Sequence, residues 1–76
     1  MNNKNRKDLR KVIEIINDLK DIVTTIQEEE QEKFDNLPEG LQDSETGMNI
    51  EAAATSLEEV LTNLDEAIDN IETAII

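Results

Sequence analysis

Apolar residues recur at alternating spacings of three and four in the last third of the chain. This repeat has a period of 3.5 residues, which is typical of a coiled-coil helix and not of a strand. The stripe that it draws consists of Ala54, Leu57, Leu61, Leu64, Ile68, Ile71 and Ile75. A column of small residues lies beside it, namely Ala53, Val60, Ala67 and Ala74. The pattern predicts a helix over residues 49–75 that lets a neighbouring helix come close.

A second repeat of this kind predicts another long helix over residues 4–33. Its stripe is expected to consist of Leu9, Val12, Ile16, Leu19, Val23 and Ile26. Three further isoleucines flank the stripe, at positions 13, 15 and 22. The apolar arc is therefore wider than one helix contact requires, and such helices usually contact two neighbours, as in a four-helix bundle. Asn3 or Asn5 is expected to cap the helix, with Asn5 favoured because Asp8 follows three residues later.

Residues 34–48 connect the two helices. The connection contains the helix breakers Pro38, Gly40 and Gly47. It also contains the apolar residues Phe34, Leu37, Leu41 and Met48, which a flexible linker would not need. We expect the connection to fold over the end of the helix pair and cap it; the alternative is an exposed contact for a partner. The start of the following helix stays open because three residues can cap it, namely Ser44, Thr46 and Asn49.

These elements predict an all-α fold, an antiparallel two-helix hairpin that forms a single domain over residues 1–76. The chain has no cysteine and one aromatic residue, so neither a disulfide nor an aromatic core can stabilise it. Small chains without such supports commonly associate. We therefore expect the coiled-coil-like hairpin to form a homo-oligomer, either a four-helix bundle dimer or a higher assembly.

The charge of the chain is negative and unevenly distributed. The net charge is −12; residues 1–33 hold seven basic and eight acidic residues, whereas residues 34–76 hold eleven acidic residues and no basic one. Nucleic acids and anionic membranes are polyanions, so direct binding to either is not expected. A basic protein surface is the natural partner. Because the sequence also has no membrane span and no signal peptide, we expect a cytoplasmic protein.

The sequence offers little support for catalysis or for a bound metal. Histidine is absent, which removes the common zinc ligand and the usual general base. The pairs Glu29-x-x-Glu32 and Glu66-x-x-Asp69 superficially resemble magnesium motifs of all-helical nucleotide pyrophosphohydrolases, but a hairpin would hold them about 20 Å apart. Residues 43–47 lack the pattern of a calcium loop. We expect no enzyme activity, no cofactor and no metal site.

Acidic residues form repeated columns on the helix over residues 49–75. We name as the acidic face Glu51, Glu58, Glu59, Asp65, Glu66, Asp69 and Glu72. Four of these recur every seven residues, about 10.5 Å apart, so the helix presents carboxylates in rows as a nucleic acid presents phosphates. The simpler interpretation is that a coiled-coil helix keeps charge outside for solubility. Both interpretations stay open at the level of the sequence.

The run FDNLPEGLQDSETG, followed by the acidic helix LEEVLTNLDEAIDNIE, resembles small acidic helical proteins encoded by phages and prophages of Gram-positive bacteria. The resemblance covers residues 34–44 closely and residues 50–72 in character. It implies a mobile-element origin and a bacterial host cytoplasm. The expected function is binding to a basic host protein, as an inhibitor of a defence or nucleic-acid-processing factor; the alternative is a coiled-coil adapter in an assembly. An antitoxin would differ from the inhibitor only in its target.

Overall fold

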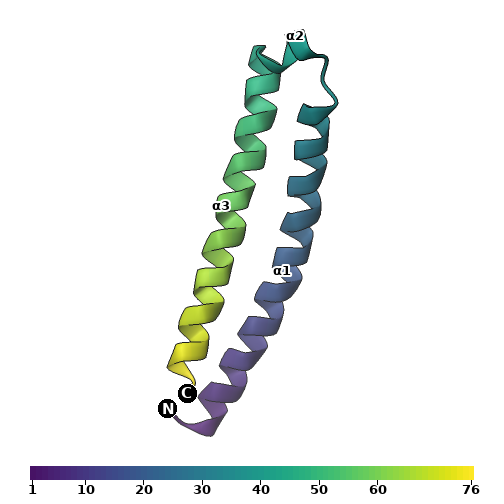
Figure 1. Cartoon of the computed structure of the whole chain (residues 1–76). Helices are drawn as coiled ribbons and strands as arrows, with labels where there is room; N and C mark the ends of the chain where they lie inside the picture. Colours follow the sequence, from purple (N-terminus) through teal and green to yellow (C-terminus); the bar gives the residue numbers. More distant parts are fainter.

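The protein forms a helical hairpin, described here over residues 1–76 by a computed structural model. The elements are α1 (Asn3–Asp35), the short α2 (Glu39–Gln42) and α3 (Glu45–Ala74). Helices α1 and α3 run side by side in opposite directions, with α2 at one end and both termini at the other (Figure 1). The rod measures 58 × 15 × 13 Å. The prediction of an all-α fold with two long packed helices is confirmed.

Helix α1 begins one residue earlier than predicted and has a different cap. The side chain of Asn2, rather than that of Asn3 or Asn5, accepts a hydrogen bond from the backbone N–H of Asn5 at 2.7 Å. This bond satisfies one of the N–H groups that a helix start leaves without a partner. At its other end α1 continues to Asp35, two residues before Leu37. Because Pro38 follows, Leu37 is disfavoured in a helical conformation, so α1 ends before Leu37.

The connection is shorter than predicted because α3 begins at Glu45 rather than near residue 49. Ser44 is the cap among the three candidates, since its hydroxyl accepts a hydrogen bond from the Gly47 N–H at 3.2 Å. The half-buried Gln42 side chain closes the turn by donating hydrogen bonds to the carbonyl oxygens of Phe34 at 3.2 Å and Leu37 at 3.4 Å. The α1–α3 turn is therefore held by backbone and amide contacts.

Gly47 lies inside the first turn of α3 and does not break the helix as expected. Its φ is not positive, so backbone freedom is not the reason for a glycine here. The residue is buried, and a Cβ atom built on it would lie 2.5 Å from the Leu41 carbonyl oxygen and closer still to that of Gln42. The turn therefore approaches α3 so closely that a side chain would not fit.

The apolar residues of the connection divide into two groups. Phe34 and Leu37 are half-buried at the turn end of the hairpin, in keeping with the predicted cap. Leu41 and Met48 are 51% and 62% exposed, so they do not contribute to it. The connection thus covers the end of the hairpin with one half and leaves the other half in solvent.

Two polar contacts between α1 and α3 fix the register of the hairpin. Lys20 forms an ion pair with Asp65, and the Gln27 side chain donates to Glu58 at 3.2 Å. A step of seven residues along α1 therefore corresponds to a step of seven residues back along α3. Opposing positions have residue numbers that add to about 85, which places Val23 opposite Leu61 and Glu30 opposite Ala54.

The interface contains the predicted stripe of α3 and half of the predicted stripe of α1, namely Leu9, Ile16 and Val23. The half-buried residues of α3 include Leu57, Leu61, Leu64, Ile68, Ile71 and Ile75, and Ala54 is fully buried. On α1 the half-buried positions with three–four spacing are Leu9, Ile13, Ile16, Lys20, Val23, Gln27, Glu30 and Phe34. Val12, Leu19 and Ile26, which were expected in this stripe, are exposed.

Polar side chains can occupy the α1 interface because their polar ends reach its edge. Lys20 and Gln27 lay their aliphatic parts across the interface and direct their nitrogen atoms to Asp65 and Glu58. Glu30, whose side chain is 24% exposed, lies at the level of the small Ala54 and pairs with Lys33. The inward stripe of α1 is therefore interrupted by polar residues, whereas Val12, Leu19 and Ile26 form an apolar row that faces solvent.

Candidate functional site

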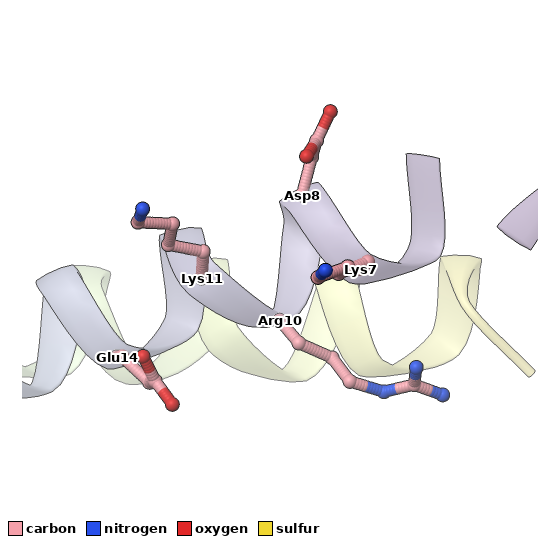
Figure 2. Close-up of a pocket in the computed structure, with 5 residues that line it drawn as sticks. All are labelled: Lys7, Asp8, Arg10, Lys11 and Glu14. Atoms are coloured by element: carbon pink, nitrogen blue, oxygen red, sulfur yellow. The ribbon is translucent and has the colours of Figure 1, made fainter. Parts of the chain in front are cut away.

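The surface recesses of the hairpin are not ligand pockets. One is lined by Glu29, Glu32, Lys33 and Asn36, and the other by Lys7, Asp8, Arg10, Lys11 and Glu14; neither has a hydrophobic wall. Each set comes from α1 and its end alone. Figure 2 shows that the side chains of the second set point away from the helix in different directions and do not converge on a common point. A binding function must therefore use the surface of the rod.

The acidic face occupies one continuous arc of α3. At about 100° per residue, the column Glu51, Glu58, Asp65 and Glu72 lies at the edge next to α1, and Glu59 and Glu66 lie on the back of the helix. Asp69 lies between these two columns. All seven residues of the face are exposed. Folding therefore brings the predicted carboxylates together on one side of the rod.

Two residues of the acidic face already have partners inside the hairpin. Asp65 pairs with Lys20, and Glu58 accepts a hydrogen bond from Gln27. The carboxylates of the other five take part in no ion pair and no hydrogen bond, namely those of Glu51, Glu59, Glu66, Asp69 and Glu72. These five carboxylates are free to meet a partner without breaking a contact of the fold.

The basic start of α1 forms no ion pair with α3. Asp65, Asp69 and Glu72 lie on the half of α3 that runs towards this end, yet the one ion pair between the helices joins Asp65 to Lys20, in the middle of α1. Lys4 pairs with Asp8 of its own helix at 3.1 Å. The remaining cations of the first turns have no ion pair, which leaves a basic patch on an otherwise acidic rod.

One ionisable group has a perturbed pKa. The hydrogen bond that Lys33 donates to Glu30, 2.9 Å long, and the charge of Glu30 raise the pKa of Lys33 above 10.5, with a smaller contribution from Glu29. The pair lies in the last two turns of α1, where Lys33 is exposed and the Glu30 side chain is 24% exposed. It stabilises the last turn of α1, where a cation also meets the negative end of the helix dipole favourably.

The acidic residues of the hairpin are spread along its length and not gathered at one point. No cluster of three or more aspartates and glutamates is arranged to hold a metal ion. The register places Glu29 opposite residue 56, ten residues before Glu66, so the two acidic pairs noted in the sequence lie about 15 Å apart along the rod. None of the three helices contains an apolar stretch of the length that a membrane span requires.

Sequence reasoning missed an exposed apolar stripe on α1. Val12, Leu19 and Ile26 are 39%, 46% and 43% exposed, and they lie next to Ile15 and Ile22, which are 51% and 58% exposed. The signal was present in the sequence as an apolar arc too wide for one contact. The pattern alone did not indicate which half of that arc would face α3.

No protein-family model, curated protein or solved structure matches the chain.

Proposed function

We propose that this chain is a non-enzymatic, phage-type inhibitor that binds a basic, nucleic-acid-binding surface of a host protein through the acidic face of α3. The observation that carries the proposal is the arc of seven exposed carboxylates, five of them without a partner in the fold. No lysine or arginine follows Lys33 to offset them.

The spacing of the carboxylates suits such a surface. Residues seven apart on α3 lie about 10.5 Å apart along a straight rod, so they present a regular row of negative charge. A protein channel that receives nucleic acid is lined by lysine and arginine and attracts a negative rod over a long range. Because the contact is electrostatic, its affinity should fall as the salt concentration rises.

The resemblance of residues 34–44 to proteins of phages and prophages supports a target in the cytoplasm of a bacterial host. An acidic rod suits a defence or nucleic-acid-processing factor as that target. A basic toxin would be recognised by the same chemistry.

The test compares two variants with the same charge change on different helices. The α3 variant removes three unpartnered charges of the acidic face, and the control removes three exposed charges of α1. The substitutions are Glu59→Gln, Glu66→Gln and Glu72→Gln in the first, and Glu14→Gln, Asp18→Asn and Asp21→Asn in the second. Each variant is immobilised and used to purify proteins from a Gram-positive host lysate at low and at physiological salt.

The proposal expects the unchanged chain and the α1 control to retain a basic nucleic-acid-binding protein that the α3 variant loses. Adding the unchanged chain should also release nucleic acid from that purified partner. Equal retention by both variants would show that net charge alone attracts the partner. Recovery of no basic protein at either salt concentration would refute the proposal.

The alternative function is a structural adapter in a phage particle or another protein assembly. The exposed aliphatic residues of α1 favour it, because assembly proteins bury such surfaces against their neighbours. An adapter would keep its activity when the acidic face is neutralised and would lose it when the exposed stripe of α1 is made polar.

A further inference from the structure

The exposed stripe of α1 is a continuous apolar surface. Its residues are Val12, Ile15, Leu19, Ile22 and Ile26, spaced by three and four along about 21 Å of helix. Large aliphatic side chains that are 39–58% exposed normally occur singly on the surface of a soluble monomer. Five in one row indicate a surface that another helix covers. We call this row the α1 stripe.

The α1 stripe continues onto α3 without a charged residue. Lys20–Asp65 and Gln27–Glu58 mark one side of the hairpin, and the helical spacing places the α1 stripe on the opposite side. The small column of α3 lies beside it there, with Val60 38% exposed. Beyond that column the next residues of α3 are uncharged as well, namely Asn49, Ser56, Asn63 and Asn70. A molecule of net charge −12 thus keeps the middle of this side free of carboxylates, and Asp8 and Glu29 lie beyond the two ends of the stripe.

The hairpin exposes more surface than a compact monomer of its mass, and the excess is about the area that a partner of similar size would cover. The accessible surface is 5599 Å² for a mass of 8.6 kDa, whereas a compact monomer of that mass exposes about 4,700 Å². The excess of about 900 Å² is close to the roughly 800 Å² that each partner buries in a standard protein interface. Only 2 of 76 residues are buried, so the hairpin has almost no core of its own.

The α1 stripe and the charges around it suit a second copy of the same chain in the opposite direction. The spacing of the stripe reads almost the same in both directions about Leu19, so a two-fold axis there brings Val12 of one copy near Ile26 of the other. Residues 1–14 carry five basic and two acidic residues, and residues 24–35 carry one basic and five acidic ones. An antiparallel pair places these oppositely charged segments side by side, whereas a parallel pair places like charges together.

We infer that two copies pack their α1 stripes together, antiparallel and centred on Leu19, to form a four-helix bundle. Ile15 and Ile22 lie further from α3 than the rest of the stripe, which places the partner helix over α1. The α3 helices then lie on the outside, and their acidic faces point away from the interface on both sides. This inference does not depend on the proposed function, because it concerns the opposite side of the rod.

The first test measures the mass in solution by sedimentation equilibrium. The unchanged chain should have twice the mass of 8.6 kDa at micromolar concentration. Leu19→Asp places a charge in the interface and should weaken association by roughly 100-fold or more. The matched control is Asn17→Asp, which adds the same charge at an exposed position outside the stripe and should leave association within about threefold. A monomeric unchanged chain would overturn the inference.

The second test needs no disruptive substitution and reports direction. The chain has no cysteine, so single cysteines can be placed at will and joined by a short bismaleimide. Leu19→Cys should link to itself, and Val12→Cys should link to Ile26→Cys when the two are mixed. Asp18→Cys, turned about 100° away from the stripe, should not link. Self-linking of Ile26→Cys, or capture of a different protein in place of a second copy, would refute the antiparallel homodimer.

Discussion

Substitution of Gly47 by alanine should destabilise the protein, although alanine is the better helix former. The new methyl group would lie 2.5 Å from the Leu41 carbonyl oxygen and 2.8 Å from the Gln42 carbonyl carbon. These atoms belong to the backbone, so no side-chain rotation can relieve the overlap. The turn must move away from α3, and the movement would also weaken the hydrogen bond from the Gly47 N–H to Ser44.

The magnitude follows from three opposing contributions. Overpacking of a tight site costs about 1–3 kcal/mol, and loss of the Ser44 cap costs about 1 kcal/mol. The higher helix propensity of alanine offsets about 1 kcal/mol of this destabilisation. We therefore expect the free energy of unfolding to fall by about 1–3 kcal/mol, without a change of helical content at 25 °C if the hairpin stays folded.

Gly40→Ala is the matched control. It makes the same substitution in α2, where a Cβ atom would have nothing within 4 Å and φ is not positive. Alanine at such a site stabilises by about 0.4–1 kcal/mol, because it restricts the unfolded chain. Urea denaturation followed by circular dichroism at one fixed protein concentration would measure both variants, since association contributes to stability. Equal stability changes of the same sign would refute the close approach of the turn to α3.

Four further changes test the interface, the cap and the surface. Leu61→Asp should lower the free energy of unfolding by at least about 2 kcal/mol because it buries a charge opposite Val23; retained cooperative unfolding at the same midpoint would contradict the register. Lys20→Leu should raise stability by about 1 kcal/mol in the same assay, since the leucine fills an interface position and the lost exposed ion pair contributes about 0–1 kcal/mol. Ser44→Ala should cost about 1 kcal/mol through loss of the α3 cap, and an unchanged midpoint would argue against that cap. The interaction with Glu30 that raises the pKa of Lys33 stabilises the fold below pH 10.5, and this stabilisation is lost as the pH rises through the raised pKa. The difference in stability between the unchanged chain and Lys33→Met should therefore disappear in that range.

Sequence patterns were sufficient to predict the hairpin, because α3 has one clear stripe and an acidic back. Residues such as Leu61 and Ile68 have few alternatives to facing the neighbouring helix. On α1 the apolar residues cover two adjacent stripes, and the alternating spacing selected Val12, Leu19 and Ile26, which the structure turns outward, together with residues that face α3. The inward stripe is interrupted by Lys20, Gln27 and Glu30, whose fit depends on partners in α3. Such partners depend on register, which the sequence of one helix does not contain.

The acidic face could be listed from helical spacing alone, since a period of seven residues determines which carboxylates share a side. Helical spacing alone could not predict which of these carboxylates form a contact with α1. Glu58 and Asp65 looked equivalent to Glu51 and Glu72 in the sequence, yet only the first two meet polar residues of α1. The role of Gly47 was also hidden, because a glycine required by a close backbone approach looks the same in a sequence as one that ends a helix.

The two ends of the chain lie at the same end of the rod, and this arrangement has a practical consequence (Figure 1). A fluorescent protein or an affinity tag attached at either terminus would sit at one pole, roughly the whole length of the molecule away from α2 and the turn. Attachment at either terminus would therefore leave the same stretch of helix surface unobstructed.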